Sequence, residues 1–181
     1  MKTGDSGARP AVFLDRDGTL IEDRGHLRDP SEVIFFPETA GALRRLGERY
    51  ALFLITNQRG IAEGKITMEE CGRVNRHVVE VLRAAGVVIR EAYVCPHRRE
   101  EGCDCIKPKP HFPRLAAAQY GLDLTRSYAV GDHPHDAELG VAMGGQGIYV
   151  LTGHGQKHRG ELAIPCPVVA DIRAATDWIL G

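Results

Sequence analysis

The stretch Val12-Phe13-Leu14-Asp15-Arg16-Asp17-Gly18-Thr19-Leu20 places two carboxylates directly after an apolar run. The apolar residues predict a buried strand, and open α/β sheets hold their ligands where such strands end. Residues i and i+2 of an extended chain point the same way, so we expect Asp15 and Asp17 to face one pocket while Arg16 points elsewhere. Gly18 then allows a sharp turn or the close approach of a ligand.

The paired carboxylates suggest a metal-assisted reaction. Two neighbouring carboxylates repel each other, which raises one pKa or calls for a cation between them. Asp15 and Asp17 therefore suit Mg2+ beside a nucleophile. The alternative is a chemically silent strand followed by an Asp-Gly turn. The apolar strand before the pair, together with the segments described below, favours the chemical interpretation.

The composition is that of a soluble globular protein. The chain has 181 residues, of which 43% are hydrophobic and 26% charged, and its formal net charge is -1. This size predicts a single domain over residues 1–181, and we expect a monomer. The balanced charge gives no electrostatic reason to expect nucleic acid or a membrane as a partner. Residues 1–10 are polar and no apolar run matches a membrane span, so we expect a cytoplasmic protein whose cysteines are thiols or metal ligands.

Strand-like and helix-like segments alternate along the chain. We expect strands near residues 12–14, 51–55, 87–94, 128–130, 147–151 and 168–170. We expect helices near residues 38–49, 68–85, 111–120, 137–143 and 172–180. This alternation predicts an α/β fold with a doubly wound parallel sheet, with ligands at the carboxyl ends of its strands. No segment between the motifs is long enough for a large cap domain.

Two further strand ends carry groups suited to phosphate and metal. Thr56-Asn57-Gln58-Arg59-Gly60-Ile61 offers a hydroxyl and two amides that can donate hydrogen bonds to phosphate oxygens, although the same string suits an ordinary polar turn. Asp132 and Asp136 follow another buried strand and could complete a Mg2+ shell. The alternative is that these carboxylates cap the helix that follows, and Asp136 is expected to serve this role in part.

A cysteine-rich loop spans residues 95–105. Cys95, His97, Cys103 and Cys105 supply the four ligands of a tetrahedral Zn2+ site, and the ion would order a loop that has no hydrophobic core of its own. Because all four ligands come from protein, such a zinc shapes the loop and takes no part in catalysis. The alternatives are incidental surface cysteines or a disulfide.

A lysine follows this loop directly. Lys107 could stabilise a transferring phosphate and keep Asp15 ionised, whereas Lys109 is expected to be merely solvated.

The combined motifs resemble the HAD superfamily of phosphotransferases. This resemblance implies that Asp15 is the nucleophile and Asp17 the general acid/base. It also implies that Thr56 and Lys107 bind the transferring phosphate, and that Asp132 binds Mg2+.

The string Thr-Asn-Gln-x-Gly-Ile-Ala and the cysteine-rich loop resemble one branch more narrowly. That branch contains the D-glycero-D-manno-heptose 1,7-bisphosphate phosphatases and the histidinol-phosphate phosphatases. The resemblance implies a Mg2+-dependent phosphomonoester hydrolase that forms an aspartyl-phosphate and removes the 7-phosphate of the heptose bisphosphate in nucleotide-heptose and lipopolysaccharide biosynthesis. The alternatives are a histidinol-phosphate or other small-molecule phosphatase and a catalytically weak phosphosugar-binding module. A nucleic-acid 3′-phosphatase is disfavoured because no basic stripe is evident.

The resemblance also assigns residues to the substrate and the metal ions. The implied substrate-binding residues are Asp23, Arg24, Gly25, His26, Thr56, Asn57, Gln58, Arg59 and Lys107. The implied Mg2+ ligands are Asp15, the main-chain carbonyl of Asp17 and Asp132, with Asp136 and His133 as further candidates. The chain has Ile106 where this branch usually has arginine, and His133 where lysine is usual. We expect Arg59, itself unusual, to replace that arginine; we assign no role to His154 and His158.

Overall fold

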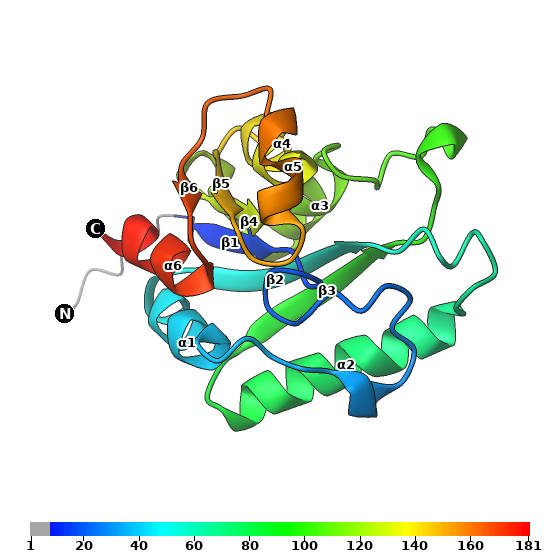
Figure 1. Cartoon of the computed structure of the whole chain (residues 1–181). Helices are drawn as coiled ribbons and strands as arrows, with labels where there is room; N and C mark the ends of the chain where they lie inside the picture. Colours follow the sequence, from blue (N-terminus) through cyan, green and yellow to red (C-terminus); the bar gives the residue numbers. More distant parts are fainter. Residues whose placement is uncertain (1–7) are drawn as a thin grey trace.

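A computed structural model describes residues 8–181 and shows one six-stranded parallel sheet (Figure 1). The strands are β1 (Ala11–Leu14), β2 (Ala51–Asn57), β3 (Ile89–Cys95), β4 (Tyr128–Gly131), β5 (Gln146–Val150) and β6 (Val168–Val169). They lie in the order β3-β2-β1-β4-β5-β6. The direction of winding reverses between β1 and β4, and in doubly wound sheets ligands bind at that point.

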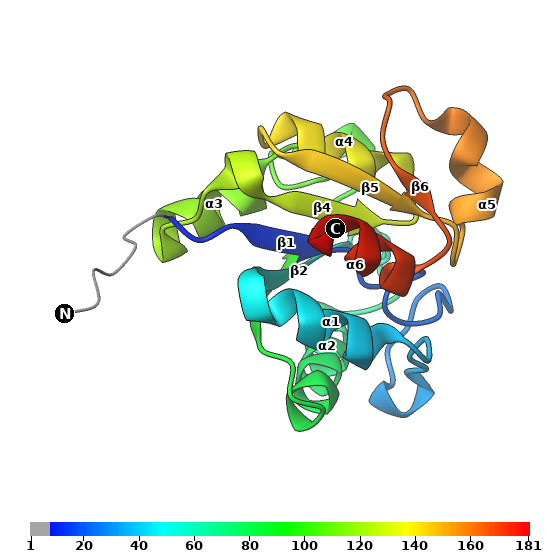
Figure 2. The same ribbon diagram turned by 90° about the vertical axis from the view of Figure 1, so that its left-hand side faces the viewer.

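Helices cover both faces of the sheet (Figure 2). They are α1 (Thr39–Arg49), α2 (Met68–Ala84), α3 (His111–Tyr120), α4 (Pro134–Ala142), α5 (Gly155–His158) and α6 (Ile172–Leu180). Apolar residues of α1, α2 and α6 pack in one core, with Leu14 of β1 among them. Residues of α3 and α4 pack in a second core on the opposite face, against Phe13 and Phe53, whose stacked rings lie 5.3 Å apart. The predicted doubly wound architecture is confirmed.

Local sequence accounts for several helix boundaries. Thr67 and Glu70 form a capping box at the start of α2, and Gly121 ends α3 in the left-handed conformation. The start of α4 was predicted too late. The helix begins at Pro134 because proline suits the first helical position and the Asp136 side chain caps the N–H of His133. No sequence pattern predicts α5, which is only four residues long.

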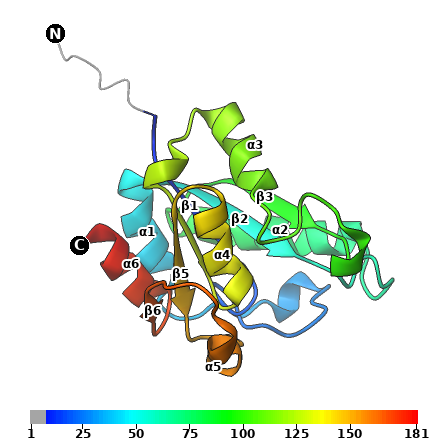
Figure 3. The ribbon, with the colours of Figure 1, turned by 90° about the horizontal axis from the view of Figure 1, so that it is seen from above.

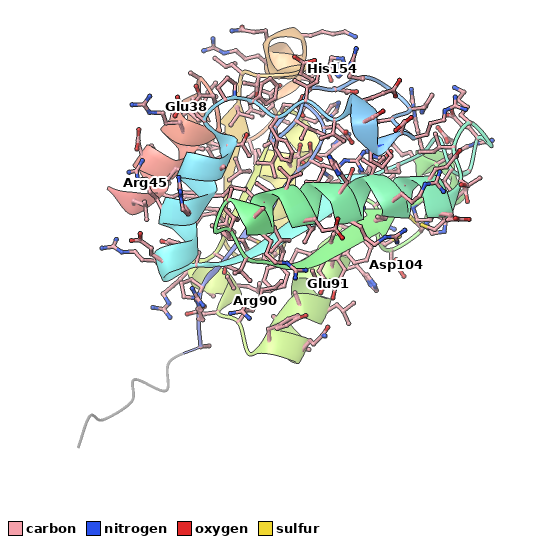
Figure 4. All side chains as sticks on the ribbon, turned by 90° about the horizontal axis from the view of Figure 1, so that it is seen from below. Glu38, Arg45, Arg90, Glu91, Asp104 and His154 are labelled. Carbon is pink, nitrogen blue, oxygen red and sulfur yellow. The ribbon has the colours of Figure 1, made fainter. Side chains whose placement is uncertain are left out.

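The strands at the two edges of the sheet are protected. Arg90 and Glu91, labelled in Figure 4, are exposed on the edge strand β3, where charged side chains disfavour pairing with another chain. At the other edge, β6 is only two residues long. None of the helices in residues 8–181 combines the length and hydropathy needed to cross a membrane. The expectation about a leader segment at residues 1–10 falls mostly outside the described residues.

Candidate active site

Asp15 lies at the end of β1 in contact with a buried lysine. Its N–H donates to the carbonyl of Val130, 2.9 Å away, which holds the residue between β1 and β4. The Lys107 ammonium, only 5% exposed, lies 2.6 Å from Asp15 Oδ1 and 2.6 Å from Asp136 Oδ1. The same ammonium donates to the carbonyl of Ile55 at 3.0 Å. Residues far apart in the sequence therefore meet at the switch point of the sheet, as the motifs predicted.

Three carboxylates form a buried group, which we call the carboxylate cluster: Asp15, Asp132 and Asp136. One oxygen from each lies within 4.8 Å of the others. Burial raises the pKa of Asp15 well above its ordinary value; Lys107 opposes the rise, and the neighbouring carboxylates add to it. Burial, with the charge of Asp136, also raises the pKa of Asp132, to about 7. Such mutual repulsion suits oxygen ligands that share a divalent cation.

The two carboxylates beside Lys107 offset the effect of its burial. Burial alone would lower the pKa of this ammonium, but the negative charges of Asp136 and Asp15 outweigh that effect and raise it. Its backbone N–H donates to Asn57 Oδ1 at 3.2 Å, so the end of β2 positions the residue. The lysine is thus a fixed positive charge beside the carboxylate cluster, where a phosphate could be held.

Two glycines allow the chain to close around Asp132. A Cβ atom at Gly18 or at Gly153 would collide with the carboxylate of Asp132, and both residues have positive φ angles, +81° and +53°. Thr152 donates its hydroxyl hydrogen bond to the carbonyl of Gly18 (2.7 Å), and the N–H of His154 donates to Asp132 Oδ2 (2.7 Å). The segment after β5 therefore fixes one oxygen of Asp132.

The expectation that Arg16 points away from the carboxylates is wrong. Its guanidinium is completely buried and contacts the Asp17 carboxylate, with Nη2 2.7 Å from Oδ2. Nη1 of Arg16 also donates to Asn75 Oδ1 of α2 at 2.6 Å. Alternation along a strand determines only the direction in which a side chain leaves the backbone. The long side chain of Arg16 bends so that its guanidinium contacts the neighbouring Asp17 carboxylate. Asp17 also accepts a 2.7 Å hydrogen bond from Gln58 Nε2, so two neighbours hold its carboxylate.

The residues at and after the end of β2 differ in how deeply they are buried beside the carboxylate cluster. Thr56 is buried and its hydroxyl accepts a hydrogen bond from Gln58 Nε2 at 2.8 Å. Asn57 contacts the backbone of Lys107, as described above. Arg59, by contrast, has a side chain that is 76% exposed, and among residues 8–181 it forms one ion pair, with Glu63 at 3.7 Å. Its guanidinium is therefore free to meet a ligand in solution.

The segment that holds four of the implied substrate-binding residues, Asp23, Arg24, Gly25 and His26, lies near the same edge of the sheet. The N–H of Gly25 donates to Asp23 Oδ1 at 2.8 Å, and Asp23 Oδ2 lies 3.3 Å from His154 Nδ1. The ring of His26 lies against Gly60, where a Cβ atom would be only 2.5 Å from His26 Nδ1. Arg24 is exposed. Asp23 and His26 thus approach the motif segments, whereas Arg24 points its guanidinium toward the carbonyl of Glu32, 3.5 Å away.

The cysteine cluster consists of Cys95, His97, Cys103 and Cys105, at the far end of β3 from α1 (Figure 3). All four ligand atoms lie within 4.8 Å of one another. The Sγ–Sγ distances are 3.3, 3.6 and 3.7 Å, and His97 Nδ1 lies 3.3 Å from Cys105 Sγ. Thiolates at about 2.3 Å from a tetrahedral zinc would be about 3.8 Å apart, so the donor set fits this ion. All five cysteines are free, as expected for thiols or ligands.

The loop is anchored to the segment that carries Lys107. Lys109, expected to be solvated, donates instead to the carbonyls of Gly102 (3.1 Å) and Cys103 (2.7 Å). Arg99 donates to the carbonyl of Lys107 at 3.3 Å. Ile106 is buried, at 8% exposure, and has no polar group to offer a ligand. The shape of the loop therefore controls the backbone on both sides of Lys107.

Comparisons with known proteins agree with this architecture. Residues 104–175 match the model of the HAD-hydrolase-like family. A relative from Vibrio cholerae, named D-glycero-beta-D-manno-heptose-1,7-bisphosphate 7-phosphatase, is 36% identical over 96% of this chain and 97% of its own. A relative of the same name from Escherichia coli is 32% identical over 95% of this chain and 88% of its own.

Solved structures give the same assignment. The crystal structure of D,D-heptose 1,7-bisphosphate phosphatase from B. bronchiseptica, in complex with magnesium and phosphate, superposes with a TM-score of 0.86 at 30% identity, covering 94% of this chain and 98% of that one. The corresponding enzyme from Burkholderia thailandensis gives a TM-score of 0.72 at 27% identity, covering 96% of this chain and 99% of that one. The resemblance inferred from the motifs is confirmed: the chain belongs to the HAD-like hydrolases, in the family of the D-glycero-D-manno-heptose 1,7-bisphosphate 7-phosphatases.

Proposed function

We propose that this protein removes the 7-phosphate of D-glycero-D-manno-heptose 1,7-bisphosphate in a Mg2+-dependent reaction. The observation that carries the proposal is the contact of Lys107 with Asp15 and Asp136, next to Asp132, at the switch point of the sheet. The names of the full-length relatives support the substrate, and the B. bronchiseptica structure with magnesium and phosphate supports the metal. We retain the prediction of a cytoplasmic monomer.

The first chemical step is assigned to Asp15. A carboxylate oxygen of Asp15 attacks phosphorus in line with the ester oxygen; the new O–P bond forms as the bond to the sugar oxygen breaks. Asp17 gives a proton to that leaving oxygen, and its contacts with Arg16 and Gln58 orient the carboxylate for the transfer. Lys107 and Thr56 hold the oxygens of the phosphate.

The second step hydrolyses the aspartyl-phosphate and regenerates the free carboxylate of Asp15. Asp17 accepts a proton from water as the water oxygen attacks phosphorus, and the aspartyl-phosphate bond breaks to release phosphate and the Asp15 carboxylate. Asp15, Asp132 and the main-chain carbonyl of Asp17 are the residues that would hold Mg2+, with Asp136 next to them. When bound, the ion supplies positive charge against the phosphate oxygens and the nucleophile.

The substrate assignment is tested by phosphate release in the presence of Mg2+. The substrates are the two anomers of heptose 1,7-bisphosphate, histidinol phosphate and a panel of sugar monophosphates. We expect one heptose bisphosphate anomer to give the highest kcat/KM. A preference for histidinol phosphate would keep the chemistry and replace the substrate, whereas no turnover of any ester would contradict the enzymatic proposal and favour a binding module.

The cysteine cluster is proposed to hold a structural zinc ion. Replacing Cys105 with serine should remove one equivalent of zinc per chain and lower kcat/KM by roughly 100-fold, because Lys107 lies two residues further on and small misplacements of a phosphate-binding group are costly. Metal analysis and phosphate release measure the two effects. Cys166→Ser, which alters a partly buried thiol outside the cluster, is the matched control. Equal zinc contents in the two variants would contradict the proposal.

Arg59 is proposed to bind substrate phosphate in place of the arginine that Ile106 replaces. Because the Arg59 side chain is 76% exposed and weakly paired, Arg59→Ala should leave the fold intact and raise KM about tenfold, with a smaller change in kcat. Steady-state kinetics measure the difference. Arg114→Ala on α3 removes another exposed arginine and should leave KM unchanged. An unchanged KM in Arg59→Ala would refute the replacement.

A further inference from the structure

His133, His158 and Glu161 converge, and we call this group the histidine site. It lies at the start of α4 and the end of α5, two helices that Figure 1 shows close together. One ligand atom from each residue lies within 4.8 Å of the other two. The ring centroids of His133 and His158 are 4.8 Å apart, and Glu161 Oε1 lies 2.7 Å from His158 Nδ1. Turn and charged residues surround His158 in the sequence and predict no role for it, but the fold places its ring against that of His133.

The backbone of His133 is held at the start of α4, and one nitrogen of its ring lacks a hydrogen-bond partner among residues 8–181. The residue precedes α4, and its backbone N–H donates to Asp136 Oδ2 at 3.0 Å. Its Nδ1 atom is buried and finds no hydrogen-bond partner within residues 8–181. A buried nitrogen without a partner is costly, and such atoms in native structures often mark a missing ion or ligand. The ring that carries this atom is also the one that converges with His158 and Glu161.

We propose that the histidine site binds a divalent transition-metal ion of the zinc class. Neutral imidazoles with one carboxylate are a zinc ligand set, and they bind Mg2+ poorly because that ion prefers oxygen. The nearby carboxylate cluster offers oxygen ligands alone, so the two sites select different ions. Three protein ligands leave at least one position open, and the side chain of Glu161 is 60% exposed. The bound ion therefore remains accessible to water or to an anionic group.

The neighbouring His135 provides a matched control. Its ring centroid is 4.7 Å from that of His133, but its Nδ1 is paired with Glu138 at 3.2 Å and it is not one of the three converging ligands. The measured quantity is the number of zinc ions bound per chain, determined by elemental analysis. Before the measurement, the full-length protein is stripped of metal with a chelator, reloaded with Zn2+ and separated from unbound metal. We expect His158→Gln to bind one zinc fewer than the unaltered protein, and His135→Gln to bind the same number.

The comparison does not depend on what the cysteine cluster holds. Cys105→Ser should lose a different zinc equivalent, so the double variant Cys105→Ser/His158→Gln should lose both. If His158→Gln fails to fold, as judged by circular dichroism, Glu161→Gln changes an exposed carboxylate of the same site and should weaken binding of the same zinc at least tenfold. Equal zinc contents in the unaltered protein and in the folded variant, or an equal loss in His135→Gln, would overturn the proposal.

Discussion

Replacing Asp15 with asparagine is expected to lower phosphate release by about 10⁴-fold or more, because the amide cannot form the acyl-phosphate bond. The fold should survive. Asparagine has nearly the same shape, and the Lys107 ammonium keeps its contacts with Asp136 and the carbonyl of Ile55. The change also removes one negative charge from three mutually repelling carboxylates. Initial-rate assays and thermal unfolding of the purified variant measure the two properties.

A control separates loss of the nucleophile from loss of any carboxylate. Asp177→Asn removes an exposed carboxylate that pairs with Arg45 at 2.6 Å between α6 and α1. Arg45 is labelled in Figure 4, on α1 beside α6. This variant should retain full activity. Activity of Asp15→Asn within tenfold of the unaltered protein would rule out the proposed covalent step, and an unfolded Asp15→Asn would show that the carboxylate is needed for stability.

Replacing Lys107 with methionine should damage both stability and activity. Methionine fills similar space but leaves Asp15 and Asp136 buried without their common cation. Removing one partner of a buried ion pair costs about 3–5 kcal/mol of the free energy of unfolding, which for a chain of this size lowers Tm by roughly 6–20 °C. The variant should also lack measurable turnover, because no charge remains to hold the phosphate.

Differential scanning calorimetry in Mg2+-free buffer measures the stability effect, since a bound cation would partly replace the lost charge. Lys65→Met is the comparison: Lys65 is half exposed and pairs with Glu63 at 2.7 Å. Exposed pairs contribute about 0–1 kcal/mol, so this variant should unfold within a few degrees of the unaltered protein. A Lys107→Met protein that is as stable as Lys65→Met would mean that the two carboxylates do not depend on the Lys107 ammonium for their burial.

Sequence alone predicted the parts of the fold that local chemistry dictates. Apolar runs located the strands, and the polar groups that follow them indicated the active edge, because parallel strands end on one side of a sheet. The ion pair of Asp15 with Lys107 joins residues 92 positions apart, and resemblance to a family supplied it as a functional role rather than a contact. Local pattern cannot show which distant groups touch.

The missed features depend on such distant contacts. Arg16 meets Asn75 across 59 positions, and nothing near Arg16 in the sequence indicates that its guanidinium is buried. The histidine site depends on α5, a four-residue helix too short for periodicity to reveal. The spacing His158-x-x-Glu161 was the available signal, and it became informative only once the fold brought His133 beside His158.

The central position of β1 affects how the protein folds as it is synthesised. β1 pairs with β2 on one side and with β4 on the other, and β4 ends at Gly131. A nascent chain that has emerged only as far as α3 therefore has an apolar strand with one open edge, a site at which other chains can pair. Asp136, which shares the ammonium of Lys107 with Asp15, emerges later still. We therefore expect the buried ionic centre to form only in the last third of synthesis, and ribosome-bound fragments that end before residue 131 to be the most prone to aggregate.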